Sequence, residues 1–392
     1  MLAIILLAFM TGCGRGNRQT TDGLITVDVT KSYPKKELIL QDFLDVEYIP
    51  LETNDDFITM AQILAIGKEI MLFRNMGPDG DILIFDRNGK GLRVINRRGQ
   101  GPEEFIGLVG LVALDEDGDE MFINDMRGRK IVVYDLFGHF KRSFTFREEG
   151  ILGYTQIDIF DRDHLLCLDD AISSNSLDDR KQEIFKVVSR QDGGVTNIIQ
   201  IPFTAKKVST LYLEGGAMNV RDRKTVPYRD SWLLVEPSSD TIYSYLPDHS
   251  MIPFMTRTPS IQSMDPGIFL YPGVLTDRYF FMRTIKIEMF DWNSNPWPGT
   301  NLAYDRQEQV IFESVVYNGD FITKRPVSMY NSERETDIYL INSEDIVFAQ
   351  KLEAFELVEA YKEGKLKGKL QEIAAGLDEE DNAVIMIAKH KF

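Results

Sequence analysis

The sequence predicts an all-β fold, a six-bladed β-propeller of four-stranded antiparallel blades. Two observations support this prediction. First, residues 82–90 match residues 131–139 without a gap, with an Asp and a Gly in register, and weaker copies occur at 242–245 and 302–305. Repetition at spacings of this kind is typical of propellers and other repeat architectures. Second, six apolar runs each follow a short polar turn; they are residues 69–74, 120–126, 164–170, 231–237, 278–284 and 345–351.

Each apolar run is interpreted as the second strand of a blade, because the turns before the runs contain the Asp, Asn, Gly and Ser residues that favour hairpins. Candidate first strands precede the turns at 62–66, 107–114, 154–160 and 337–341. Third and fourth strands are clearest at 130–135 and 141–146. The resulting unit of about 45 to 65 residues fits a four-stranded propeller blade with its loops.

A propeller must close its ring, and one blade is expected to combine strands from both ends of the chain, since an open sheet edge invites pairing with other chains. Residues 24–29 alternate like a single strand, and residues 383–388 form an isolated apolar strand at the C-terminus. We expect these two segments to pair in the last blade. Residues 352–377 have apolar residues at helical spacing and predict a helical insertion in that blade, divided by Gly364 and Gly368.

Composition narrows the possible partners. The chain has 392 residues with 44 Lys and Arg against 61 Asp and Glu, a net charge of -17. This acidity would repel a phosphate backbone, so nucleic acid is excluded as an expected partner. Only two cysteines occur, so no disulfide framework is expected. Cys167 lies in an apolar run and is interpreted as a small buried residue.

The N-terminus predicts export. Residues 1–13 are mostly apolar, too short to span a bilayer, and end in Met10-Thr11-Gly12-Cys13, which resembles the bacterial lipobox. We therefore expect residues 1–13 to be a lipoprotein signal peptide and Cys13 to be lipidated. Residues 14–23 would then be a flexible tether, and residues 24–392 the propeller.

Residues 121–144 are similar to the NHL repeat, and the wider pattern resembles the six-bladed β-propeller lipoproteins of gut Bacteroidales. The segments that carry this resemblance are 49–53, 97–105 and 381–385. The resemblance implies a lipid-anchored protein of the outer membrane, in a family without an assigned biochemical function. The basic stretch 14–18, where surface-exported relatives tend to carry acids, favours the periplasmic face over the cell surface.

Two loops contain candidate binding residues. The glycine-rich segment 99–105 is interpreted chiefly as a crossing between blades, with Arg98 and Gln100 as possible donors to an anionic or sugar ligand. Trp292 and Trp297 lie in a loop with amide neighbours, a combination that suits stacking on sugar rings or pinning of an insertion. The acid-rich stretch 115–119 indicates a solvated hairpin more than a calcium loop.

Polar residues interrupt the second strands near their ends, where equivalent blades would place them around one mouth of the central channel. We expect a mixed-charge pocket there, with salt bridges between blades as the alternative interpretation. The residues are Arg74, Asp125, Asp169, Glu236, Arg283 and Gln350.

These observations predict a membrane-anchored binding or scaffolding module with a ligand site on a propeller face, for a glycan or a protein partner. A monomer without a cofactor is expected. The alternative is a metal-dependent lyase or lactonase-like hydrolase, with a divalent ion such as calcium in the central channel. Fold alone does not decide between them.

Overall fold

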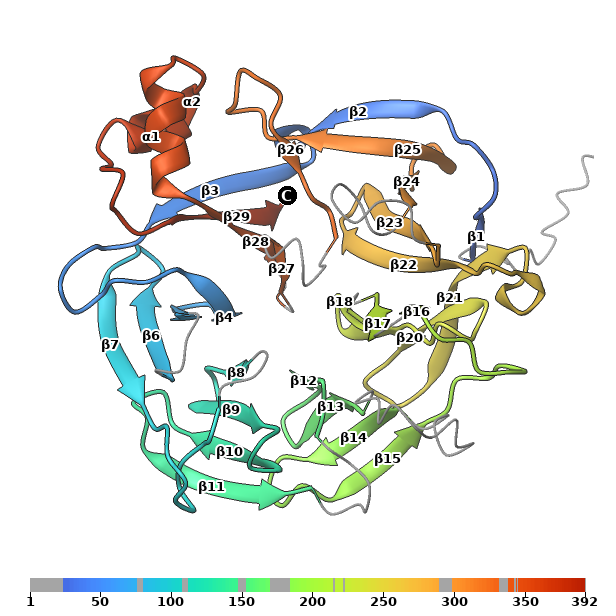
Figure 1. The fold of residues 1–392 in the computed structure, drawn as a ribbon, viewed down its shortest axis with the longest axis horizontal. Helices are drawn as coiled ribbons and strands as arrows, with labels where there is room; N and C mark the ends of the chain where they lie inside the picture. Colours follow the sequence, from blue (N-terminus) through green and yellow to red (C-terminus); the bar gives the residue numbers. More distant parts are fainter. Residues whose placement is uncertain are drawn as a thin grey trace, which may run out of the picture.

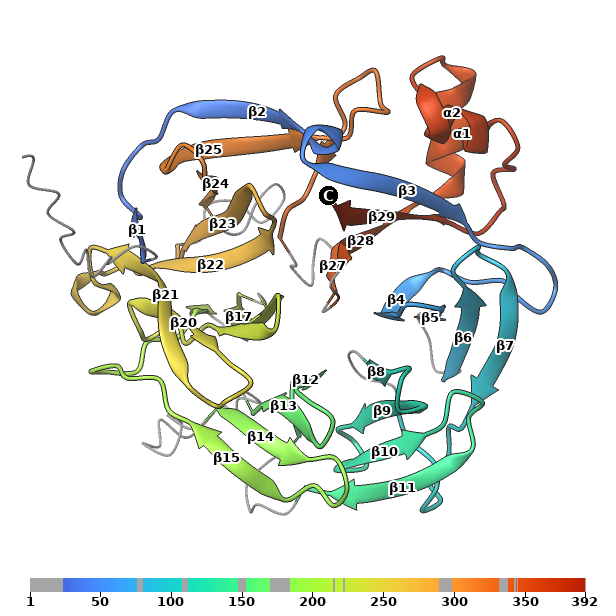
Figure 2. The ribbon, with the colours of Figure 1, turned by 180° about the vertical axis from the view of Figure 1, so that it is seen from behind.

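The computed structural model describes residues 24–391 except 76–79, 108–111, 147–152, 170–183, 214–215, 221–222, 289–297, 331–337, 342 and 344. Its described strands form seven sheets, of which six are blades arranged radially around an axis and one is a two-stranded hairpin (Figures 1 and 2). The predicted all-β, six-bladed propeller is confirmed.

Blades 1 to 3 follow one another along the chain, each with its first strand nearest the axis (Figure 1). Blade 1 contains β4 (Gln62–Ile66), β5 (Ile70–Arg74), β6 (Asp81–Asp86) and β7 (Gly91–Asn96). Blade 2 contains β8 (Val112–Asp115), β9 (Glu120–Asp125), β10 (Lys130–Tyr134) and β11 (Phe140–Thr145). Blade 3 contains β12 (Gln156–Ile159), β13 (His164–Leu168), β14 (Phe185–Ser189) and β15 (Val195–Ile199).

Blades 4 to 6 complete the ring, and all six apolar runs provide the second strand of a blade, as expected. Blade 4 contains β18 (Thr225–Tyr228), β19 (Ser231–Leu234), β20 (Thr241–Tyr245) and β21 (Met251–Thr258). Blade 5 contains β22 (Ile268–Leu275), β23 (Tyr279–Lys286), β24 (Gly299–Asp305) and β25 (Val310–Tyr317). Blade 6 contains β27 (Ile338–Leu340), β28 (Ile346–Leu352), β29 (Val384–His390) and β3 (Leu44–Pro50). Along the chain, a hairpin of β16 (Thr210–Leu213) and β17 (Gly216–Asn219) separates the strands of blade 3 from those of blade 4. The short strand β26 (Pro326–Val327) pairs with β25.

Strands from the two ends of the chain share blade 6, but the N-terminal strand is not the one expected. β3 pairs antiparallel with β29 over seven residues, from Val384 opposite Pro50 to His390 opposite Leu44. Residues 24–29 were expected at this position, and that prediction is wrong. Their strand β1 (Ile25–Asp28) instead pairs in parallel with β21 of blade 4.

The correction has a physical reason in the path of the chain. After β1, the strand β2 (Lys35–Ile39) pairs in parallel with β25 of blade 5, and only then does the chain reach blade 6 as β3. The N-terminal segment therefore runs along the outside of three successive blades (Figure 1). It adds a fifth strand to blades 4 and 5 and buries Ile25, Val27 and Leu38.

The duplicated turn has a common geometry. Asp86 Oδ1 accepts hydrogen bonds from the backbone N–H groups of Asn88 and Lys90, at 2.8 and 3.0 Å. Asp135 Oδ1 accepts equivalent bonds from Phe137 and His139, at 2.9 and 2.8 Å. The aligned acid in the sequence repeat is therefore the residue that organises the turn between the third and fourth strands.

A residue with positive φ ends this turn in blades 1 to 5. Glycine occupies the position in blades 1 to 3, as Gly89, Gly138 and Gly193, with φ of +84°, +85° and +73°. In blades 4 and 5 the same position holds His249 and Gln309, with φ of +65° and +54°. Residues other than glycine rarely adopt this conformation, so glycine marks the turn in the sequence of blades 1 to 3. In blades 4 and 5 the turn is kept but the glycine is replaced, and the repeat is therefore harder to recognise in the second half of the sequence.

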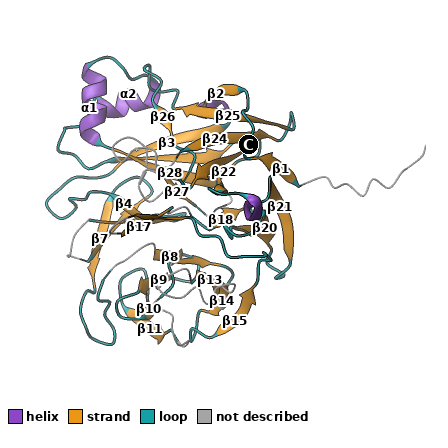
Figure 3. Cartoon of the chain, turned by 45° about the vertical axis from the view of Figure 1, so that its right-hand side comes forward, coloured by secondary structure: helices purple, strands orange, loops and turns teal. Residues whose placement is uncertain are grey.

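The helical insertion lies between β28 and β29 of blade 6, as expected. It consists of α1 (Ala354–Lys362) and α2 (Gly368–Ala374), which lie beside each other at the rim (Figure 3). Gly364 has φ of +66° directly after α1, and Gly368 has φ of +61° at the start of α2. These conformations favour glycine and separate the two helices.

The core lies between neighbouring blades. In the blade 1 core, Phe73 and Phe85 form an edge-to-face ring pair with centroids 5.6 Å apart. Cys167 is a buried free cysteine in the cluster between blades 2 and 3. Burial raises the pKa of its thiol well above the usual value, which agrees with its interpretation as a packing residue.

Candidate functional site

The polar residues expected around one channel mouth form separate, local contacts. Arg74 Nε donates to Gln62 Oε1 at 2.8 Å, within blade 1. The buried Asp125 carboxylate accepts hydrogen bonds from the backbone of Ile106 at 3.0 Å and of Gly128 at 2.9 Å. Asp125 thus fixes the turn after β9.

Two further members of this set are paired with lysines. The buried Glu236 carboxylate accepts hydrogen bonds from Lys206 Nζ at 2.9 Å, and Asp169 lies 3.1 Å from Lys186 Nζ. Gln350 lines a cavity at the junction of blades 5 and 6, which is described below, and Arg283 packs against Tyr330 of the same cavity. The remaining four residues are not among the described residues that line this cavity.

The segment around Arg98 and Gln100 crosses from blade 1 to blade 2 and is held by backbone contacts. Gly99 N donates to Phe105 O at 3.0 Å, and Phe105 is fully buried. Arg98 Nε donates to Ile106 O at 3.3 Å. Gln100 is exposed. The geometry therefore supports the interpretation of this segment as a crossing and leaves the Gln100 side chain at the surface.

The acid-rich turn 115–119 makes contacts to both neighbouring blades. Glu116 Oε1 accepts hydrogen bonds from the backbone N–H groups of Glu69 at 3.0 Å and Ile70 at 2.9 Å. Asp115 forms an ion pair with the buried Arg190 of blade 3. These carboxylates therefore link blade 2 to blade 1 and to blade 3.

A buried ion pair connects the inner strands of the ring. Arg223, just before β18, donates to the carboxylate of Asp158 on β12, and its other amino group donates to Leu340 O at 3.4 Å. The Thr225 hydroxyl also donates to Asp158, at 2.7 Å. These contacts connect blades 3, 4 and 6 across the axis. Within the described part of the chain, the buried Arg223 Nε has no hydrogen-bond partner.

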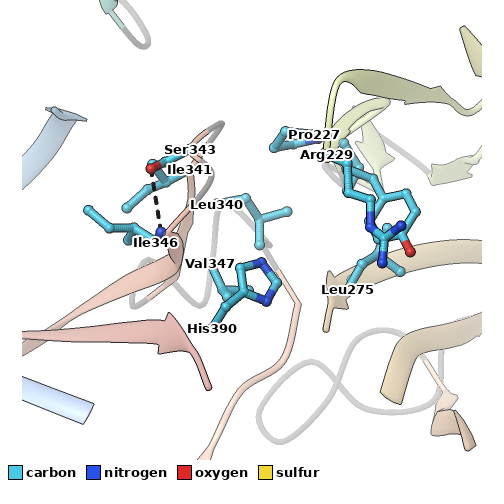
Figure 4. Close-up of a pocket in the computed structure, with 12 residues that line it drawn as sticks. Pro227, Arg229, Leu275, Leu340, Ile341, Ser343, Ile346, Val347 and His390 are labelled. Carbon is cyan, nitrogen blue, oxygen red and sulfur yellow. Dashed lines mark hydrogen bonds between the residues drawn. The ribbon is translucent and has the colours of Figure 1, made fainter. Parts of the chain in front are cut away.

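A small cavity lies at one end of the channel, between blades 4, 5 and 6. Figure 4 shows His390 of blade 6 on one side of it, with Arg229 and Leu275 on the other. His390 Nδ1 lies 3.6 Å from Asp277, while burial lowers the pKa of the imidazole. The cavity volume is only about 20 Å³. This is room for a single water molecule.

A larger cavity of about 270 Å³ lies at the junction of blades 5 and 6. Its walls come from β24, β25, β26 and the three residues after β26, with one residue, Gln350, from β28. None of the ten described residues that line it carries a charge. We call this cavity the blade 5–6 pocket.

The blade 5–6 pocket forms where two strands separate. β24 and β25 are paired from Asp305 opposite Val310 only as far as Leu302 opposite Glu313. β26 takes over at Val316. Ser314 and Val315 lie between these two ladders, although both pair with β2 on the other side. Consecutive residues of a strand turn their backbone groups to opposite edges, so one of these two presents its N–H and C=O toward the gap.

The hydrogen-bonding side chains of the blade 5–6 pocket are amides and hydroxyls. Ser314 and Gln350 are buried, at 4% and 7% exposure, and both line the pocket together with the exposed Asn301. Arg283 lies just outside, with its guanidinium 5.7 Å from the centre of the Tyr330 ring. Of the residues predicted from the sequence, Gln350 therefore lines the pocket and Arg283 packs beside it.

Other parts of the pocket were not predicted from the sequence. Asn301, Ser314 and Met329 come from segments without a recognisable motif, and they meet only through the strand separation in blade 5. Three predicted site residues, Cys13, Trp292 and Trp297, lie outside the residues that the structure describes. No described helix has the length and apolar character of a membrane span.

The fold and the pocket define the class of protein: a six-bladed β-propeller with a cavity of about 270 Å³ between two blades, whose described lining residues carry no charge. Residues 24–389 match the family described as "Domain of unknown function (DUF4934)", and the chain belongs to this family. No curated protein matches the chain.

Solved structures show the same fold. A candidate exported protein from Bacteroides fragilis is 15% identical, with a TM-score of 0.62 and coverage of 94% of this chain and 100% of that one. A member of the DUF4221 family from Bacteroides vulgatus is 10% identical, with a TM-score of 0.52 and coverage of 90% and 99%. Virginiamycin B lyase from Staphylococcus aureus is more distant, at a TM-score of 0.38 and 11% identity, with coverage of 89% of this chain and 100% of that one.

Proposed function

We propose that this protein is an exported binding module, anchored through Cys13 in the outer membrane with its propeller facing the periplasm, and that it captures a small neutral polar ligand in the blade 5–6 pocket. The observation that carries this proposal is the pocket itself. Its volume is about 270 Å³, against about 20 Å³ for the cavity in the channel.

The size and lining of the pocket limit the ligand. Drug-sized ligands occupy pockets of roughly 300–1,000 Å³, so this pocket suits one sugar ring or one amino-acid unit. Its lining provides amides and hydroxyls but no charge among the described residues. A charged ligand would lose its hydration without gaining an ionic partner, so a neutral ligand is favoured.

A ligand panel tests the proposal. Neutral monosaccharides and amino-acid amides would be screened against the purified mature chain by thermal shift, because a ligand that binds only the native state raises the melting temperature. Hits would be measured by calorimetry on wild type, on Gln350→Met and on Gln100→Met. Gln350 lines the pocket, and Gln100 is the matched exposed amide between blades 1 and 2.

The proposal expects binding that Gln350→Met weakens and Gln100→Met leaves unchanged. It fails if no panel member binds, or if Gln100→Met weakens binding while Gln350→Met does not. Anchoring is tested separately in cells, where Cys13→Ala should move the protein from the membrane fraction to the soluble fraction.

A further inference from the structure

We infer that the blade 5–6 pocket recognises an acetamido group, that is, a secondary amide whose carbonyl carbon carries a methyl group. This inference rests on the proposed function and specifies the chemistry of its ligand. It combines three features of the pocket: an apolar wall, buried uncharged hydrogen-bonding groups, and a strand edge.

The apolar wall suits a methyl group. Val316, Val327 and Met329 line the pocket and are themselves 2%, 6% and 2% exposed. They form the apolar part of the lining of this cavity of about 270 Å³. A methyl group placed against them would lose its contact with water, which is favourable in proportion to the apolar area removed.

The polar groups suit an amide. A carboxamide such as Gln350 both donates and accepts hydrogen bonds, as the Ser314 hydroxyl does, so together they can serve the C=O and the N–H of a bound amide. Both residues are buried. Buried polar groups are nearly always hydrogen-bonded, to protein, to water or to a ligand.

The strand edge adds a fixed pair of backbone groups. Ser314 and Val315 lie between the ladder with β24 and the ladder with β26, and β2 occupies only their opposite edge. An amide of the ligand can therefore continue the hydrogen-bonding pattern of a strand over one residue, as peptides do at sheet edges. Asn301 and Pro326 lie at the two ends of the gap.

The acetamido group has two sources in a cell envelope, N-acetylated sugars and N-acetylated peptides. Matched ligands distinguish them. The sugar set is N-acetylglucosamine, glucose and glucosamine, which differ only at one ring carbon. The peptide set is N-acetylglycine methylamide and glycine methylamide. Affinities would be measured by calorimetry on the mature chain.

We expect at least one acetylated compound to bind about tenfold or more tightly than its matched partners, a preference equivalent to about 1.4 kcal/mol. Binding of N-acetylglucosamine alone assigns a sugar, and binding of N-acetylglycine methylamide alone assigns a peptide. Val327→Thr places a hydroxyl in the apolar wall with little change of volume. It should reduce the preference for the acetylated member, whereas Val310→Thr, at an exposed position of β25 that does not line the pocket, serves as the control.

The inference is overturned if glucose or glycine methylamide binds as tightly as its acetylated counterpart in a manner sensitive to Gln350→Met. In that case the pocket remains the ligand site and only its specificity is reassigned. It is also overturned if acetylated ligands bind but Gln350→Met and Val327→Thr leave their affinities unchanged, which would place the site elsewhere and remove the proposed function as well.

Discussion

Arg223 donates to the carboxylate of Asp158 near the axis of the ring, and so joins the first strand of blade 3 to the start of blade 4. Both side chains are buried, and Arg223 also reaches the backbone of blade 6 at Leu340. The channel, which in a propeller is the obvious place for a ligand, is therefore occupied by protein at this level. A cavity of about 270 Å³ lies away from this ion pair, at the junction of blades 5 and 6.

Removal of one partner of this ion pair should be costly. Among the described residues, Arg223→Met leaves the buried Asp158 carboxylate with the Thr225 hydroxyl as its side-chain donor, and we expect the free energy of unfolding to fall by about 3–5 kcal/mol. The double variant Arg223→Met/Asp158→Leu should recover part of this loss, because no buried charge remains. Urea-induced unfolding measures both; an equal or greater loss in the double variant would contradict the account.

Acid should weaken the junction of blades 2 and 3 through Glu120. Burial raises the pKa of this carboxyl, but hydrogen bonds from Arg142, Lys141 and Arg190 outweigh it and bring the pKa to about 2. The folded-state pKa lies below the usual value of 4.5. Glu120 therefore stabilises the fold above about pH 4.5, and this contribution of about 2–3 kcal/mol is lost as the pH falls toward 2. The difference in free energy of unfolding between wild type and Glu120→Gln should be smaller at pH 3 than at pH 7. A difference that stays constant between the two pH values would rule this out.

The five equivalent turns predict opposite effects of glycine. Gln309 has φ of +54° on an exposed turn, so Gln309→Gly should raise the free energy of unfolding by about 0.5–1 kcal/mol. Gly89 has φ of +84°, and a Cβ there would lie 2.0 Å from the backbone oxygen of Pro50. Gly89→Ala should lower the free energy of unfolding by about 2 kcal/mol or more. Thermal unfolding of both variants checks the pair, and a stabilising Gly89→Ala would refute the turn assignment.

Truncation tests which N-terminal strand closes the ring. A chain starting at residue 40 lacks β1 and β2 but keeps six complete blades, so it should still unfold cooperatively. Its stability should be lower by about 3–6 kcal/mol, because the burial of four apolar side chains is lost. A chain starting at residue 52 lacks β3 as well and exposes the whole edge of β29, so it should lose its cooperative transition. Similar behaviour of the two truncations in calorimetry would disprove closure by β3.

The sequence predicted the repeating part of the fold because that part is encoded locally. Asp86 and Asp135 make the same turn in two blades, and this turn appears in the sequence as an aligned acid and glycine. The parallel pairing of β1 with β21 joins segments more than two hundred residues apart and leaves no local signal beyond the alternation of Ile25 and Val27. Such pairings depend on which sheet edge is open in the folded ring.

The candidate site could be predicted only in part for the same reason. Gln350 and Arg283 were recognisable as polar residues that interrupt apolar strands. The pocket that Gln350 lines depends on the separation of β24 from β25, which neither composition nor periodicity indicates.

The most direct test of the central claim, that the blade 5–6 pocket binds the ligand, is methyl NMR of the protein labelled at its methionines. Met329 lines the pocket, whereas Met121 is buried in blade 2 and Met255 in blade 4. Titration with N-acetylglucosamine and with N-acetylglycine methylamide should shift the Met329 methyl resonance in a saturable manner and leave those of Met121 and Met255 in place. Saturable shifts confined to Met121 or Met255, or none at any of the three, would contradict the account.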